Sequence, residues 1–421
     1  MLIFQNLVAS GLSVALTCSR PGLSLAMNSK RVLLPLTLGG FGIGMTEFVM
    51  MGILPDVAKA LHISIPTAGH LISAYALGVV VGAPLMVALT SKLPPRKILA
   101  LLMLIFAVGN GLSAVAPGYE LMLLTRFISG LPHGAFFGVG AVVAGRLAGP
   151  GKEAQAVSIM FAGLTIANII GVPIGTYLGH TFSWRIPFVL IVVVALLTVL
   201  SVRRLLPDLP ARETNLRDEF VAFTRLEPWL IIAITILGNG GFFAWFSYIV
   251  PLFTEVAGFS HNAVTILMVL AGVGMALGNM LGGWLTDRMS PLRATTWLLV
   301  AMAAALFTIP FAAQHQWSTV LMTMLTGALA FSTAAPIQML MIRAAKGSEM
   351  LASSLSQSGF NTGNALGAYL GGLPIAAGLG YTSPEWVGGT LVVGGIGFAA
   401  FLVLRRRRQA QPEPAVAEAV A

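Results

Sequence analysis

The sequence predicts an all-α membrane protein whose twelve transmembrane helices form two six-helix bundles. The first observation behind this prediction is composition: of the 421 residues, 57% are hydrophobic and only 9% are charged, and the mean hydropathy is +0.88. A soluble domain carries about 25% charged residues, because its surface faces water. The second observation is that the apolar runs are about 20 residues long, the length of a helix that crosses a bilayer, rather than the shorter alternating segments of a β-barrel.

Charged residues and polar clusters divide the chain into twelve apolar runs, each expected to form one span. The first six are 33–54, 68–90, 97–116, 120–145, 155–179 and 185–202. The other six are 229–253, 263–286, 293–312, 317–342, 351–376 and 386–404. The long polar connection between the sixth and seventh spans contains Thr214 as a helix N-cap and apolar residues on one face. That pattern predicts an amphipathic helix at the membrane surface.

The third observation is an internal repeat, because a shift of 196 residues aligns the two halves of the chain. The matched pairs include Pro55 with Pro251, Ser64 with Ser260, Glu153 with Glu349, Asn168 with Asn364 and Gly171 with Gly367. A register held across several spans indicates two parallel repeats of six helices. Two such halves can rock about a site between them.

These features divide the chain into five segments. They are an N-terminal extension (1–28), an N-terminal six-helix bundle (29–205), a cytoplasmic linker with the amphipathic helix (206–228), a C-terminal six-helix bundle (229–405) and a cytoplasmic tail (406–421). The extension lacks the basic region of a signal peptide. We expect translation to start at Met27, which opens the basic flank MNSKRVLL; a thirteenth span would instead place the N-terminus outside.

Basic residues predict the orientation in the membrane. Of the 24 Lys and Arg residues, 20 fall before the first span, after even-numbered spans or in the tail, whereas only Lys59 and Arg185 fall on the opposite face. Because cytoplasmic loops retain Lys and Arg, both termini are expected in the cytoplasm, in a multi-pass protein of a bacterial-type inner (plasma) membrane. The net charge of +9 then reflects topology, and no nucleic-acid partner is expected. Cys18 is the single cysteine, so neither an intramolecular disulfide nor a cysteine metal site is expected, and we predict no metal or cofactor.

Several motifs resemble those of the major facilitator superfamily. The loops GAPLMVALTSKLPPRK (82–97) and GNMLGGWLTDRMSPLR (278–293) resemble its Gly-x-x-x-Asp-Arg-x-Gly-Arg-Arg motif. The segment TRFISGLPHGAFFG (125–138) resembles the fourth-helix Arg-x-x-x-Gly motif of proton-coupled members, and GLTIANIIGVPIGTYLG (163–179) is similar to the fifth-helix antiporter motif. Together with ISIPTAGHLISAYALGVVVGAP and FAWFSY, they resemble the AraJ-type arabinose-inducible efflux permeases of the drug:proton antiporter branch, from about Ser29 to the C-terminal arginines.

The resemblance implies the major facilitator fold and transport by alternating access. It also implies that the loop with Asp287, Arg288 and Arg293 acts as a conformational latch, as the corresponding loop of the family does. The alternative is a loop whose solvated charges only set the topology. In the first copy of the loop, Ser91 stands where the motif has Asp, so a charge interaction built on that Asp is absent or moved in the N-terminal half.

Glu47 is an isolated carboxylate in the first span. At 1.5 Å per residue, it lies about 9 Å below the outer surface, level with Arg126 of the fourth span. An ionised carboxylate in hydrocarbon costs several kcal/mol unless it faces the bundle interior and is paired. The hypothesis is that Glu47 takes up a proton from outside and releases it inside, because burial favours the neutral acid and an approaching Arg126 favours the carboxylate. The alternative is a static Glu47–Arg126 strut between two helices.

His133 lies two turns deeper than Arg126, near the midplane. As a side chain that titrates near neutral pH in water, it is either a second proton-coupling group or a substrate hydrogen-bond donor. The alternative is a neutral histidine bonded to a backbone carbonyl.

Neutral polar and aromatic side chains within the spans predict the substrate site. Asn168 and Asn364 are repeat-related amides, and each either binds a polar substrate or braces the opposite helix. The C-terminal half has Phe243 where the N-terminal half has Glu47. Its candidates for substrate recognition are Asn239, Trp245, Tyr248 and Gln338. The alternative for the two aromatic residues is an interfacial belt.

Glycines at four-residue spacing line the fifth and eleventh spans. They form stripes of the small-xxx-small type, which is typical of close helix packing. A functional hypothesis makes them a sliding hinge at the interface between the halves, with Gly171, Pro173 and Gly367 as gating residues.

We therefore predict a secondary active transporter that exports small polar or amphipathic compounds, such as sugars or drugs, in exchange for protons. The sequence has no Gly-x-x-x-x-Gly-Lys-[Ser/Thr] loop to bind ATP. The alternatives are a proton-coupled importer or symporter of the same fold and a non-transporting membrane sensor, which the lack of a sizeable cytoplasmic domain disfavours. The expected partners are a small-molecule substrate, protons and the bilayer. The protein is expected to be a monomer and not an enzyme.

Overall fold

The computed structural model describes residues 29–90, 93–148, 152–210, 224–345 and 349–409, and all its regular elements are helices. The first half contains α1 (Ser29–Gly52), α2 (Leu54–Ala60), α3 (Ile65–Thr90), α4 (Pro95–Ala114), α5 (Tyr119–Leu147), α6 (Glu153–Ile166), the π-helix η1 (Ala167–Gly171), α7 (Val172–Thr181) and α8 (Ile186–Leu205). The second contains α10 (Leu226–Phe246), α11 (Ile249–Pro251), the π-helix η3 (Leu252–Val256), α12 (His261–Arg288), α13 (Pro291–Ala312), α14 (Gln316–Ser332), α15 (Ala334–Ala344), α16 (Glu349–Ala376) and α17 (Ser383–Gln409).

The helices confirm the predicted all-α membrane fold. Eleven candidate spans of the described chain are long and apolar enough to cross a membrane. The remaining predicted span is α16, which has 28 residues but carries four serines and two asparagines. Since α16 packs against α3, α10 and α17, much of its surface meets protein rather than lipid, and polar residues are tolerated there. The predicted amphipathic helix and the N-terminal extension lie outside the described residues.

The chain repeat is visible in the helix starts. The helices α3 and α12 begin at Ile65 and His261, and α4 and α13 at Pro95 and Pro291, in each case 196 residues apart. The preceding serines cap their helices alike, because Ser64 Oγ accepts from the backbone of Thr67 and Ser260 Oγ from that of Ala263. The two repeats therefore share local structure as well as sequence.

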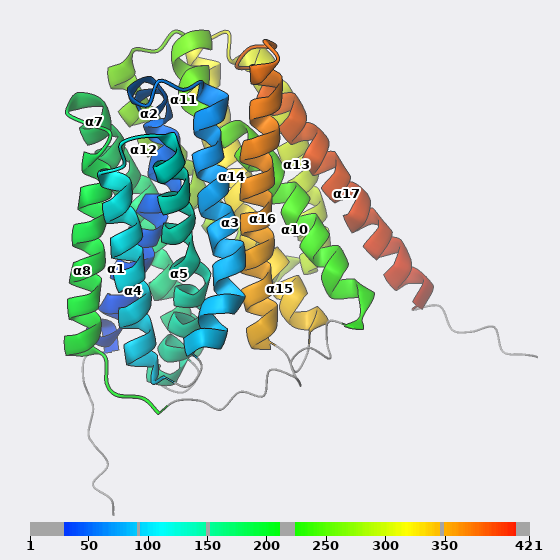
Figure 1. Cartoon of the computed structure of the whole chain (residues 1–421). Helices are drawn as coiled ribbons and strands as arrows, with labels where there is room; N and C mark the ends of the chain where they lie inside the picture. The colour runs from blue at the N-terminus through cyan, green and yellow to red at the C-terminus, as the bar shows by residue number, and fades with distance from the viewer. Residues whose placement is uncertain (1–28, 91–92, 149–151, 211–223, 346–348, 410–421) are drawn as a thin grey trace, which may run out of the picture.

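Most helix packing occurs within each half. In the first, α1 packs on α6 and α8, and α5 on α3 and α4; in the second, α10 packs on α16 and α17, and α12 on α14. The halves meet mainly where α3 packs on α16 and where α12 packs on η1 and α7. These are repeat-equivalent contacts, since α16 corresponds to α6, η1 and α7. In Figure 1, α3 and α16 run side by side through the middle of the molecule.

The two ends of the bundle differ in how tightly they close. The lower end in Figure 1 is where α1 begins and α17 ends, and the upper end carries α2 and α11. Every residue of 42–54 in the first half and of 240–253 in the second is buried, whereas 31–41 and 229–239 include partly exposed residues. The two central helices are therefore enclosed on all sides only toward the upper end.

Candidate functional site

Glu47 lies on α1 at the contact between the two halves. Its side chain is 8% exposed, and Oε1 accepts a hydrogen bond of 2.8 Å from Nδ2 of Asn364 on α16. The carboxylate of the first half is thus bound by an amide of the second half. A hydrogen bond to an ionised acceptor is about twice as strong as one between neutral groups.

The amide of Asn364 is itself held by Asn239 on α10. Asn239 Nδ2 donates to the side-chain oxygen of Asn364 and to the backbone oxygen of Phe360, at 2.8 Å. The amide hydrogens of Asn239 are therefore used inside the second half. Three residues thus form a hydrogen-bonded row that runs from α10 through α16 to Glu47.

Arg126 lies next to this row but binds the residue before Glu47. Its guanidinium donates to the Thr46 backbone oxygen at 3.2 Å and to Thr46 Oγ1 at 3.5 Å, and it sits 4.5 Å from the centre of the Tyr75 ring. Arg126 is fully buried, and this cation–π contact helps to stabilise its charge there. Within the described residues, no ion pair of 4.0 Å or less joins Arg126 to Glu47. The static strut is thus not formed in this conformation.

His133 bonds to a side chain rather than to a backbone carbonyl. Its Nδ1 lies 3.0 Å from the hydroxyl of Tyr75, and the ring packs on Phe137 at a centroid distance of 5.4 Å. Since the guanidinium of Arg126 also stacks on the ring of Tyr75, one tyrosine contacts both predicted residues of α5. The structure thus brings Glu47, Arg126 and His133 into one buried region.

Phe48, the neighbour of Glu47, also crosses to the second half. Its ring packs against Phe243 at 5.9 Å, Phe246 at 6.0 Å and Phe331 at 6.0 Å. Phe243 is the repeat equivalent of Glu47, so the two corresponding positions lie close together, one polar and one aromatic. The aromatic cluster packs the residue next to Glu47 against the second half.

Asn168 contrasts with its repeat equivalent Asn364. It lies on the π-helix η1 and is 3% exposed, and in the described chain its Nδ2 has no hydrogen-bond partner. A Cβ added at Gly272 of α12 would lie 2.2 Å from the backbone oxygen of Asn168. The backbone of Asn168 therefore packs directly against the second half. π-helical turns are frequent at functional sites.

The other predicted substrate residues are dispersed. Tyr248 closes the upper end, because its hydroxyl donates to the Ala368 backbone at 2.7 Å and lies against Gly69 of α3. Trp245 lines a small cavity inside the second half with residues of α13 and α14. Gln338 lies half-buried on α15. The structure thus groups Asn239 and Asn364 with Glu47, whereas Trp245 lies among residues of the second half.

The predicted latch residues lie at the lower end and are exposed. Asp287, Arg288 and Arg293 surround the turn between α12 and α13. Arg288 stacks on Trp284 with 4.5 Å to the ring centre, and no ion pair of Asp287 occurs among the described residues. In this conformation the charges face solvent.

The glycines of both stripes meet their nearest neighbours inside their own half, and their role as a sliding hinge between the halves stays a prediction. A Cβ at Gly171 would meet Phe41 of α1 at 2.9 Å, and one at Gly367 would meet the Gly240 backbone of α10 at 2.2 Å. Pro173, buried on α7, belongs to the same segment. The helices use other faces to contact the opposite half. The spacing of the glycines in the sequence does not show whether the glycine face packs on its own half or on the opposite half.

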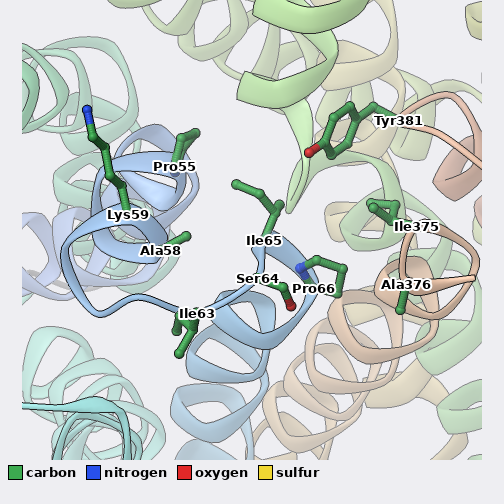
Figure 2. A pocket seen from close by; sticks show the side chains of 10 residues that line it. All are labelled: Pro55, Ala58, Lys59, Ile63, Ser64, Ile65, Pro66, Ile375, Ala376 and Tyr381. Carbon is green, nitrogen blue, oxygen red and sulfur yellow. The ribbon is translucent and has the colours of Figure 1, made fainter. Parts of the chain in front are cut away.

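A pocket of about 610 Å³ opens at the upper end between the halves (Figure 2). The first half contributes the segment from Pro55 to Pro66, and the second contributes Ile375, Ala376 and Tyr381. Lys59 points outward at its rim, whereas the Tyr381 hydroxyl points inward. Burial, and then the nearby charge of Glu255, raise the pKa of Tyr381 above its ordinary value, so that hydroxyl is a neutral donor at physiological pH.

Sequence reasoning missed three residues around the site. Thr46 binds Asn110 of α4 as well as Arg126, and Tyr75 joins Arg126 to His133. Their signal was weak, because single Thr, Asn and Tyr residues in an apolar span are common. Among the described residues no cluster of three His, Cys, Asp or Glu side chains is placed to hold a metal ion.

A comparison with protein families decides the identity of this fold. The model of the Major Facilitator Superfamily matches residues 36–350 and 259–420. The chain belongs to the major facilitator superfamily. It is thus a multi-pass membrane transporter of the major facilitator type, a family that acts on small-molecule substrates and whose members are generally not enzymes. The resemblance derived from the sequence is confirmed.

Individual relatives support the same family. The putative transporter AraJ of Escherichia coli K12 is 43% identical over 84% of this chain and 90% of its own. The inner membrane transport protein YdhP of the same organism is 42% identical over 90% of this chain and 97% of its own. A chloramphenicol resistance protein of Streptomyces lividans is 29% identical over 83% of this chain and 90% of its own.

A solved major facilitator structure shows the same fold. It is a bacterial homologue of the human lysosomal transporter Spinster, in an inward-facing and unoccupied conformation. The TM-score is 0.64 at 16% identity, and the match covers 90% of this chain and 95% of that one.

Proposed function

We propose that this transporter exports small polar or amphipathic compounds, such as sugars or drugs, in exchange for protons. The observation that carries the proposal is Glu47, a buried carboxylate at the contact between the halves, bound by Asn364 of the opposite half. A proton that neutralises this carboxylate changes a contact between the halves. Proton binding and alternating access are thereby linked.

The orientation in the membrane is supported by charge placement, and the names of two relatives support export. With the basic residues on the cytoplasmic side, the lower end faces the cytoplasm and the tightly buried upper end faces outward. This conformation is then inward-facing, with Glu47 closed off from the outside. The relatives named as an inner membrane transport protein and a chloramphenicol resistance protein favour an inner-membrane exporter.

We assign the predicted residues to three roles. Glu47 carries the proton, with Arg126 and His133 shaping its surroundings. Substrate recognition is assigned to Asn168, whose buried Nδ2 has no hydrogen-bond partner in the described chain, and to Asn239, Trp245, Tyr248, Gln338 and Asn364. Asp287, Arg288 and Arg293 at the open lower end are the latch for the opposite conformation.

Replacing Glu47 by Gln tests the proposal. Proteoliposomes with an imposed pH gradient and labelled chloramphenicol or arabinose as probes should show gradient-driven transport by the wild type. Glu47→Gln should lose it and keep counterflow without a gradient, because glutamine fills the site but cannot take up a proton. The matched control is Glu120→Gln, the same change at an exposed carboxylate, which should transport normally. Full gradient-driven transport by Glu47→Gln would sink the proposal.

A further inference from the structure

The hydrogen bond between Asn364 and Glu47 has a fixed direction. Asn364 uses its side-chain oxygen to accept from Asn239, which is anchored on the Phe360 backbone. Because the oxygen is occupied, the amide nitrogen must face Glu47, where it donates at 2.8 Å. The second half therefore presents a donor, and never an acceptor, to the carboxylate.

The first repeat has no such device. The repeat equivalent of Glu47 is Phe243 in the second half. The repeat equivalents of Asn364 and Asn239 are Asn168 and Ile43 in the first half. There the buried Nδ2 of Asn168 has no hydrogen-bond partner in the described structure. Since the fold forms with an unpaired amide at one position, the asparagine row around Glu47 serves the carboxylate rather than the fold.

The surroundings of Glu47 contain few other ionisable groups. Arg126 on α5 and Tyr75 on α3 interact with it electrostatically, and His133 lies behind Tyr75. From α16 and α10 it meets the amides of Asn364 and Asn239. The remaining helices packed against α1 carry their ionisable side chains near their ends or on exposed faces.

We propose that Asn364 is a positioning residue that holds the halves together at the upper end for as long as Glu47 is ionised. The charged carboxylate makes the stronger hydrogen bond, so loss of a proton stabilises the closed upper end. Proton uptake weakens the bond and favours separation of the halves. This rests on the proposed function and adds what the second half contributes to it. A transporter that carries neither proton nor substrate is then kept from reopening outward.

The test measures the distance between the two halves at the upper end as a function of pH. In a Cys18→Ser background, spin labels at Lys59→Cys and Ala376→Cys, exposed residues on opposite sides of the upper pocket, report the distance between the halves in liposomes. Acidification of the wild type should lower the fraction with a short distance, with a defined midpoint. In Asn364→Ala the pH-dependent change in this fraction should become smaller, and its midpoint should move up by about one to two pH units, since the ionised carboxylate loses the hydrogen bond that holds the halves together.

Two variants separate this role from a structural one. Asn364→Asp is nearly isosteric but replaces the donor with an oxygen, so its midpoint should rise at least as far. Asn361→Ala removes a buried amide from the same helix whose one bond among the described residues goes to the Gln357 backbone, so its midpoint should stay at that of the wild type. Equal shifts in Asn361→Ala and Asn364→Ala would overturn the inference.

The Glu47→Gln variant separates a failure of the proposed function from a failure of the inference about Asn364. A label distance that no longer responds to pH in Glu47→Gln supports Glu47 as the proton site. If that holds while Asn364→Ala and Asn364→Asp keep the wild-type midpoint, the inference fails and the proposed function stands. If Glu47→Gln still responds to pH as the wild type does, the proposed function fails.

Discussion

At the scale of single residues, three consecutive side chains of α1 contact different parts of the molecule. Thr46 binds Arg126 and Asn110 within the first half, whereas Glu47 and Phe48 contact the second half. Successive side chains on an α-helix point about 100° apart, because a turn takes 3.6 residues. One turn of α1 is therefore fixed to its own bundle and still reaches the other.

Arg126→Lys should reduce gradient-driven transport about tenfold or more, because a lysine cannot both bind the Thr46 backbone and stack on Tyr75 as the planar guanidinium does. Uptake of labelled chloramphenicol into proteoliposomes measures the effect. The control is Arg185→Lys, since Arg185 makes the same kinds of contact, with the Ala116 backbone and the Trp184 ring, but lies outside the site. Wild-type transport in Arg126→Lys would contradict a role for the guanidinium.

The sequence placed Glu47 and Arg126 at one depth but could not give their partners. Depth follows from counting residues along two spans, whereas a contact depends on how each helix is rotated and tilted. The bond from Asn364 to Glu47 joins residues 317 positions apart. It could not be derived before the packing of α16 was known, although the repeat already singled out Asn364.

At the scale of helices, glycine determines how closely neighbours approach. A Cβ at Gly163 of α6 would lie 2.0 Å from the Thr37 backbone oxygen of α1, far inside van der Waals contact. The stripe thus keeps α6 and α1 together as one unit. The glycine period in the sequence predicted close packing, but the partner helix came only from the structure.

Gly163→Ala should destabilise the protein by about 1–3 kcal/mol, the usual cost of overpacking. A lower thermal unfolding temperature in detergent is the expected measurement. Gly138→Ala on α5 is the control, because a Cβ there meets nothing within 4 Å, and alanine favours the helix. Equal stability of the two variants would show that α1 and α6 can move apart at no cost.

The sequence also did not reveal where helices break. The predicted span 317–342 is interrupted between α14 and α15 at Thr333, and 155–179 contains the π-helix η1. Apolar runs report burial in lipid, and hydropathy does not distinguish a π turn from an α turn. Such breaks arise from side-chain packing within the bundle.

At the scale of the whole molecule, two similar halves meet through equivalent helix pairs. The helix starts 196 residues apart agree with the repeat found in the sequence, whereas the exact limits of the two bundles stay a prediction. The amide row crosses the contact once, at Glu47. The symmetry of the fold is broken in the residues that we assign to the proton.

A disulfide across the upper end should stop transport without unfolding the protein. A Cβ at Gly372 of α16 would lie 3.5 Å from the Cβ of Pro66 on α3, within the range of disulfides. The Tyr248 hydroxyl, which would overlap the new Cβ, must move aside to admit it. Pro66→Cys with Gly372→Cys, in a Cys18→Ser background, should lose chloramphenicol transport on oxidation and regain it on reduction. Each single cysteine variant serves as a control. Continued transport by the oxidised form would show that the upper end need not open.

The single crossing of that row has a thermodynamic consequence for leakage. One hydrogen bond to a charged group contributes about 1.5–3 kcal/mol, which changes the ratio of two conformations about 10- to 150-fold. On our proposal, this ratio sets how strongly Asn364 keeps the empty carrier in the conformation with the upper end closed. If no other contact adds to it, the empty carrier should reach the outward-open conformation only about 10- to 150-fold less often than a carrier without this bond. Proton slip would then be an intrinsic property of the carrier, set by one amide.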